Sequence, residues 1–157
     1  MRISNLFILF SLISDSTLYA QNFTRKDSLQ GGFSFERVCY DVQRYDLDIT
    51  LNPEKKFISG SNTISFKMHQ ESKMIQLDLF ENMEADSIVF EGRPLKFKRE
   101  FGAVFIEFPK ILKVSDNILQ LQFYYSGNPI VAKNAPWDGG FVFSKDKNDK
   151  PWICVAV

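Results

Sequence analysis

Residues 40–66 read YDVQRYDLDITLNPEKKFISGSNTISF. Apolar residues take every second position from Tyr45 to Leu51, and a second alternating face runs from Ile58 to Met68. A period of two over this length predicts two long β-strands, each with one buried face. Asn52-Pro53 opens the turn between them, because proline fixes φ and cannot sit in a central ladder. Gly60 marks the place where we expect a bulge or bend in the second strand.

The rest of the chain repeats short alternating strands and polar turns. Further strands are expected at residues 74–79, 87–90, 95–98, 103–108, 118–125, 141–143 and 151–157. Apolar residues do not recur at spacings of three and four over the length of a helix. The sequence therefore predicts an all-β fold, an antiparallel β-sandwich, over residues 38–157.

The N-terminal residues have a different character. Arg2 precedes the apolar run LFILFSLI at residues 6–13, which is too short to span a bilayer, and small Ala20 precedes Gln21. We predict a secretory signal peptide over residues 1–20, cleaved near Ala20, so that the chain is exported without stable membrane insertion. A buried N-terminal strand is the alternative. Residues 21–37 have no period and are expected to form a flexible lead-in.

Composition bounds the class of protein. The 157 residues are 45% hydrophobic and 15% aromatic, which suits one globular domain that folds without a metal or a disulfide. Nineteen basic and nineteen acidic residues cancel, so electrostatics gives no case for nucleic acid or an anionic membrane as partner. In an exported protein Cys39 and Cys154 could form a disulfide or be buried separately, and the sequence leaves both open.

The residues offer little for catalysis or metal binding. A catalytic zinc takes about three protein ligands, and the one histidine, His69, lies where a strand gives way to a turn. Asp46 and Asp48, about 7 Å apart along a strand, could act as an acid and base pair, but the solvated face of an amphipathic strand carries such residues routinely. We therefore expect no catalytic residue and no metal ligand in this chain.

The loop at residues 135–141 is the best candidate for a contact surface. It is rich in turn formers, and an aromatic residue exposed on such a loop can supply much of the energy of an interface. The candidate residues are Trp137, Asp138, Gly139, Gly140 and Phe141. Trp137 could instead fold back over the sandwich core. Because the sequence stops on the apolar run at 151–157, we expect the sandwich to be incomplete at its C-terminal end.

Two parts of the chain resemble the aminopeptidase N family of zinc peptidases, peptidase family M1. The order of tyrosine, strand, glycine and strand in residues 40–66 resembles the opening hairpin of the family's N-terminal β-sandwich domain. GGFVFSKDKNDKPWI, at residues 139–153, is similar to a segment of secreted bacterial members that runs G-G-F-x-[WF]-S-x-D-x-x-G-x-P-W-I. With both parts, the resemblance covers roughly residues 38–157.

The resemblance implies a non-catalytic role. In that family a catalytic domain follows the sandwich and binds zinc through H-E-x-x-H and a distal glutamate, beside a Gly-x-Met-Glu-Asn segment, and none of these is present here. A Gln or Glu that helps to hold the substrate's free amine usually follows the strand that matches residues 152–157. The chain would thus be the N-terminal domain of a secreted zinc aminopeptidase-like metallopeptidase. It would pack on the catalytic domain of the same polypeptide and meet peptide substrates only there.

A different class of function stays open beside this one. A free-standing exported module that binds carbohydrate or protein could use Trp137, Tyr124 and Tyr125 for stacking. An adhesion or structural sandwich has no supporting motif beyond the fold class.

Overall fold

The computed structural model describes residues 22–156, and the expected signal peptide at 1–20 lies outside this range. The described residues form two helices, α1 (Arg25–Gly31) and α2 (Phe35–Val38), and ten strands. The strands are β1 Tyr40–Asn52, β2 Phe57–Met68, β3 Ser72–Asp78, β4 Met83–Phe90, β5 Arg93–Pro94, β6 Lys96–Glu100, β7 Ala103–Leu112, β8 Leu119–Gly127, β9 Gly140–Lys145 and β10 Pro151–Ala156. An all-β fold is confirmed, with two short helices added.

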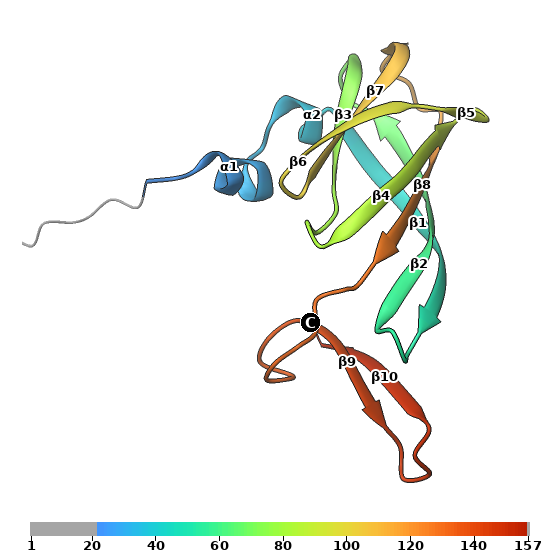
Figure 1. Cartoon of the computed structure of the whole chain (residues 1–157). Coiled ribbons are helices and arrows are strands. Elements are labelled where there is room, and N and C mark those ends of the chain that lie inside the picture. The colour runs from blue at the N-terminus through green and yellow to red at the C-terminus, as the bar shows by residue number, and fades with distance from the viewer. Residues whose placement is uncertain (1–21, 157) are drawn as a thin grey trace, which may run out of the picture.

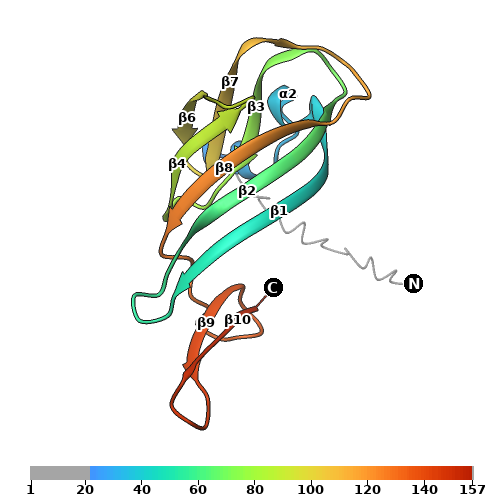
Figure 2. The same ribbon diagram turned by 90° about the vertical axis from the view of Figure 1, so that its right-hand side faces the viewer.

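The strands form three antiparallel sheets. A five-stranded sheet has the order β1-β2-β8-β4-β5, a three-stranded sheet has the order β3-β7-β6, and β9 and β10 form a separate hairpin. The two larger sheets face each other, while the β9–β10 hairpin hangs beyond one end of them (Figures 1 and 2). The chain passes between sheets within four residues, because β5 pairs with β4 and β6 pairs with β7.

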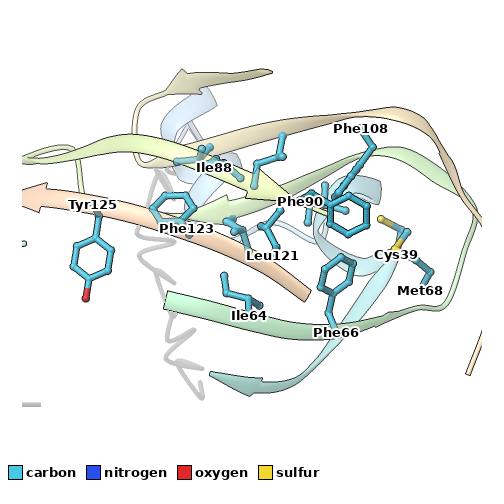
Figure 3. Close-up of a cluster of buried hydrophobic side chains, with 14 of the residues drawn as sticks. Cys39, Ile64, Phe66, Met68, Ile88, Phe90, Phe108, Leu121, Phe123 and Tyr125 are labelled. Carbon is cyan, nitrogen blue, oxygen red and sulfur yellow. The ribbon is translucent and has the colours of Figure 1, made fainter. Parts of the chain in front are cut away.

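The core lies between the two larger sheets (Figure 3). Phe66 of β2 and Phe90 of β4 both pack on Phe108 of β7, with ring centroids 6.5 Å and 5.1 Å apart. Further buried side chains come from both sheets: Ile64, Met68, Ile75, Ile88, Val104, Ile106, Leu121 and Phe123. Residues with period two therefore meet from opposite sides, as in a β-sandwich.

The opening hairpin forms as predicted, but its irregularity lies elsewhere. Residues pair from Tyr40 with Met68 to Asn52 with Phe57, and the register shifts between Val42 and Arg44. The bulge expected at Gly60 is therefore wrong, since Gly60 sits in a regular ladder between β1 and β8. Its lack of a side chain serves close approach of the neighbouring backbone instead.

The prediction that one face of the first strand is buried is wrong for its second half. The side chains of Tyr45, Leu47, Ile49 and Leu51 are 43% to 60% exposed. We call these four residues the β1 row. They share a face with the core residue Ile64, and Tyr45 lines a pocket with Gln76, Leu77 and Asp78 of β3, but the far end of β1 extends beyond the three-stranded sheet (Figure 2). The alternating sequence predicts which face of the strand is apolar, but it does not predict how much of that face another sheet buries.

The segment expected to be a flexible lead-in contains both helices, which corrects that prediction for residues 25–37. Thr24 and Asp27 form a capping box at the start of α1, where the Asp27 amide donates to Thr24 Oγ1 over 3.2 Å. Arg37 ties α1 to the sandwich, because its guanidinium donates to the Leu29 carbonyl over 2.7 Å and to Asp78 Oδ2 over 2.5 Å. Helices of seven and four residues are too short to show a helical period.

Candidate contact surface

The loop before β9 is held by its own hydrogen bonds. Both carboxylate oxygens of Asp138 accept from backbone amides, those of Lys133 and Asn134, each over 2.7 Å. The Trp137 amide donates to the Asn134 carbonyl over 2.8 Å. This arrangement leaves the Trp137 side chain 90% exposed, so it does not fold back over the core. Of the two alternatives for Trp137, the structure has the exposed one.

Gly140 and Phe141 return the chain from this loop into β9. Phe141 donates its amide to the Ile130 carbonyl over 2.7 Å and accepts from the Ala132 amide over 3.0 Å. Gly140 has a φ of 137°, and a Cβ there would lie 2.7 Å from Ile130 O. Glycine is therefore required at 140, whereas a Cβ on Gly139 would make an ordinary contact at 3.7 Å. Gly140 and Asp138 shape the loop, and Trp137 is the residue that the loop presents.

The β9–β10 hairpin is apolar on both faces. Residues directly opposite each other share a face, so Phe141 and Phe143 lie with Ile153 and Val155, and the Phe141 and Phe143 rings stack at 5.8 Å. The other face carries Val142, Cys154 and Trp152. A strand that is apolar on both faces is typical of a buried position.

The sandwich covers only part of the first face. An apolar cavity of about 440 Å³ lies between the hairpin and the end of the sandwich. Its lining includes Ile58, Met83 and Tyr125 from the sandwich and Phe141, Val155 and Ala156 from the hairpin. These residues come from strands far apart in sequence, so alternation within one strand could not predict the cavity.

Exposed apolar side chains surround the hairpin. We call them the hairpin surface: Phe80, Ile130, Val131, Trp137, Trp152 and Val155. Trp137 is the most exposed of these residues at 90%, followed by Phe80 at 66% and Trp152 at 60%. Exposed apolar side chains of this kind are typical of contact sites for other proteins, membranes or ligands. The predicted candidates Trp137 and Phe141 belong to this region, and Trp152, Val155 and Phe80 were missed because their strand or turn gave no sign of exposure.

A cluster of polar side chains connects α1 with strands β1 and β3 of the sandwich. Gln76 is buried at 2% exposure and donates to the Leu29 carbonyl and to Asp78 Oδ1, each over 3.0 Å. The Tyr40 hydroxyl donates to the Gln76 carbonyl over 2.6 Å, and burial raises the pKa of Tyr40. The cluster joins α1 to β3, and it holds no nucleophile beside a base.

The remaining sequence candidates are dispersed. His69 is a solvated residue after β2, as predicted, with Nε2 3.9 Å from Asp41 Oδ2. Asp46 forms an ion pair with Arg44 on the solvated face of β1. Cys39 is buried and Cys154 is exposed, and both are free thiols. The disulfide alternative is therefore not realised, and of the two cysteines expected to be buried separately, one is at the surface.

The described residues contain neither a metal cluster nor a spanning helix. Within residues 22–156, no group of three or more His, Cys, Asp or Glu side chains is arranged to hold a metal ion. In the same range no helix is both long and apolar enough to cross a bilayer.

Comparison with known proteins places the fold. No protein-family model matches the chain, and no curated protein matches it. Solved structures do match. An M1 zinc metallopeptidase from Deinococcus radiodurans is 21% identical with a TM-score of 0.56, and the match covers 74% of this chain and 30% of that one. A two-domain M1 zinc metallopeptidase bound to L-arginine is 20% identical with a TM-score of 0.55, covering 73% and 28%.

A third structure extends the likeness. Native yeast LTA4 hydrolase is 20% identical with a TM-score of 0.52, and the match covers 73% of this chain and 18% of that one. The chain thus spans less than a third of the length of each of these proteins. At such identities the likeness concerns the fold, so the resemblance predicted from residues 40–66 and 139–153 is confirmed at that level: this chain has the fold of a part of the M1 zinc metallopeptidases.

Proposed function

We propose that this chain is the non-catalytic N-terminal domain of a secreted zinc aminopeptidase-like metallopeptidase. The observation that carries the proposal is the β9–β10 hairpin, which is apolar on both faces and exposes Trp137, Trp152 and Val155 beyond the sandwich. Such a hairpin is stabilised by burial against a further domain. The likeness of fold to M1 zinc metallopeptidases supports a catalytic domain as that neighbour.

In this proposal the hairpin surface packs on the catalytic domain of the same polypeptide. The sandwich then forms one wall of the substrate cleft and helps to select peptides with a free N-terminus. Trp137 contributes contact area at low cost in entropy, because the hydrogen bonds of Asp138 already fix its loop. Residues 1–20 direct export, with cleavage near Ala20.

The side chains of residues 22–156 do not fit a catalytic zinc site. Such a site takes about three protein ligands and an open position. His69 has one acidic neighbour, Asp41, and its side chain is 60% exposed. In this proposal zinc would be held by the catalytic domain, where it would supply a Lewis acid for peptide hydrolysis. In this proposal the chain positions the substrate and encloses one side of the cleft, and its side chains transfer no proton.

The first test is the size of the native polypeptide. An antibody raised against this chain is used to probe the exported fraction of the source organism. We expect a band several times larger than the 18.2 kDa of this chain. The species isolated with that antibody should release amino acids from aminoacyl anilides, and a zinc chelator should abolish the release. A band at or below 18.2 kDa with no larger species would overturn the proposal.

A free-standing binding module is the second candidate. The exposed indoles of Trp137 and Trp152 favour it, since aromatic faces stack on sugar rings, whereas Tyr125 is buried and cannot serve. The test is sedimentation of the chain with insoluble polysaccharides, compared with a Trp137→Ala variant. Retention of the wild-type chain and loss of the variant would favour this candidate over the first.

A further inference from the structure

The free edge of the five-stranded sheet is the long strand β1. This strand has 13 residues and stands first in the sheet order, paired on one side with β2. It runs along the margin of the sheet in Figure 2. No other strand of residues 22–156 pairs with its outer side. Its outward backbone groups are therefore available to another extended chain.

The C-terminal part of β1 is apolar on the face that it shares with the sandwich core. Leu47, Ile49 and Leu51 of the β1 row lie on the end of β1 that extends beyond the three-stranded sheet, and they are 43% to 60% exposed. Residues 40–52 contain no proline, and the register shift lies at the other end, between Val42 and Arg44. Edges are usually blunted by bulges, prolines or charges. In residues 45–51 neither a proline nor a bulge hinders pairing, so charged side chains decide which strands can pair with this edge.

The charges lie on the opposite face of the same segment. Arg44 forms an ion pair with Asp46. Asp48 is exposed and forms no ion pair within the described part of the chain. Asp46 therefore already has a basic partner, and Asp48 is the carboxylate on this face that is left for a strand that joins the edge.

This pattern disfavours a second copy of the chain. If β1 of two copies paired antiparallel with the whole β1 row overlapped, Asp48 would stand opposite Asp48 of the other copy. A shift that sets Leu47 opposite Leu47 places Asp46 opposite Asp48. Like charges directly opposite each other destabilise a strand pair.

We propose that β1 binds an extended strand of a partner polypeptide in which apolar residues alternate with Lys or Arg. A basic residue of that strand faces Asp48, and the apolar residue next to it packs beside Leu47. Backbone hydrogen bonds to the free edge supply affinity, and the charged pairs supply selectivity. This use of β1 is independent of the metallopeptidase assignment, since it involves neither the hairpin surface nor a catalytic domain.

The test uses the full chain and two matched peptides. The probes are fluorescein-labelled, amidated heptapeptides of sequence TVKVKVT and TVEVEVT, titrated by fluorescence anisotropy at 0.15 M salt. We expect TVKVKVT to bind about tenfold more tightly, because a favourable charge pair with Asp48 replaces an unfavourable one. In the double variant Asp46→Lys with Asp48→Lys, the preference should reverse to TVEVEVT.

Two controls test whether unfolding of the variant or its changed net charge explains the result. The variant Glu84→Lys with Glu91→Lys changes net charge by the same amount at exposed positions on and after β4, which is separated from β1 by two strands, and should keep the preference for TVKVKVT. Hydrogen exchange should show slower exchange in residues 43–51 of β1 when TVKVKVT is bound. Equal affinity for both peptides, absence of binding by the folded chain, or self-association that neither peptide competes would overturn strand addition at β1. None of these outcomes alters the size of the native polypeptide, so the proposed function stands or falls separately.

Discussion

Gly60 lies under the backbone of Asp48, so closely that a Cβ on Gly60 would stand 1.9 Å from the Asp48 carbonyl oxygen. The two strands keep a regular register here, with Gly60 opposite Ile49. The absence of a side chain thus lets β1 cross β2 closely where the strands extend beyond the second sheet. A backbone atom cannot move aside as a flexible side chain can.

Gly60→Ala should therefore lower the free energy of unfolding by about 1–3 kcal/mol, the usual cost of forced backbone shifts. The measurement is urea unfolding followed by tryptophan fluorescence or circular dichroism. Gly31→Ala is the control, because a Cβ there meets nothing within 4 Å and alanine favours a helix. If both variants unfold at the wild-type urea concentration, the close approach at Gly60 has no energetic weight.

Arg37 should hold the lead-in helices on the sandwich. Its guanidinium donates to Leu29 O, Gln30 O and Asp78, and its side chain is 23% exposed. Arg37→Ala removes donors to groups that stay partly buried, which costs about 1–3 kcal/mol. The variant should also become open to trypsin at Arg25 and Lys26, as measured by limited proteolysis and mass spectrometry.

The control for Arg37 is Lys26→Ala. Lys26 pairs with Glu81 at the surface, and such pairs contribute at most about 1 kcal/mol. Its loss should leave cleavage at Arg25 unchanged. If trypsin cleaves at Arg25 equally slowly in the wild type and in Arg37→Ala, the contacts of Arg37 do not hold α1 on the sandwich.

The lead-in and the β1 row show where sequence reasoning reaches its limit. Strands with period two were predicted close to their observed positions, because alternation is a property of one strand. Thr24 and Asp27 have the spacing of a capping box, but a helix of seven residues is too short to show the apolar period that would confirm it. Whether Leu47 is covered depends on how far another sheet extends, and the 440 Å³ cavity depends on strands distant in sequence.

The same limit applies to the contact loop. Turn formers correctly predicted a loop at Trp137, but they could not tell an exposed indole from one folded on the core. The Asp138 hydrogen bonds decide this, since they fix the backbone on both sides of Trp137. The roles of Asp138 and Gly140 are thereby structural, although sequence reasoning grouped them with Trp137 as contacts.

The capping box of α1 should respond to acid. Hydrogen bonds from the Thr24 side chain and backbone lower the pKa of Asp27 below its ordinary 3.8. A depressed pKa in the folded state means that the carboxylate stabilises the helix fully above the unfolded value and progressively less as pH falls through the folded value. Hydrogen exchange of residues 25–31, normalised for intrinsic rates, should therefore rise relative to the core below pH 4. Asp27→Asn should already lack this dependence, and an unchanged profile in that variant would contradict the assignment.

The two thiols should react at very different rates. Cys154 is exposed on β10, whereas Cys39 is buried and its pKa is raised by burial. Under native conditions a chromogenic disulfide reagent should titrate one thiol rapidly, and the second should react at least about a hundredfold more slowly, through opening of the sandwich. Cys154→Ser should abolish the fast phase. Absence of both phases until a reductant is added would indicate a disulfide.

Trp137 should matter for contact and not for stability. Its side chain is 90% exposed, so Trp137→Ala should change the free energy of unfolding by no more than about 0.5 kcal/mol. Phe141 is partly buried against the core and stacks on Phe143, so Phe141→Ala should lower the free energy of unfolding by more than this, about 1–3 kcal/mol. In the larger exported polypeptide, Trp137→Ala should instead expose the interface between the domains, seen as faster proteolysis between them and weaker peptide hydrolysis at unchanged zinc content. If hydrolysis and proteolysis both match the wild type, Trp137 does not contact the catalytic domain, and polysaccharide sedimentation of the same variant then decides whether its indole binds a separate partner.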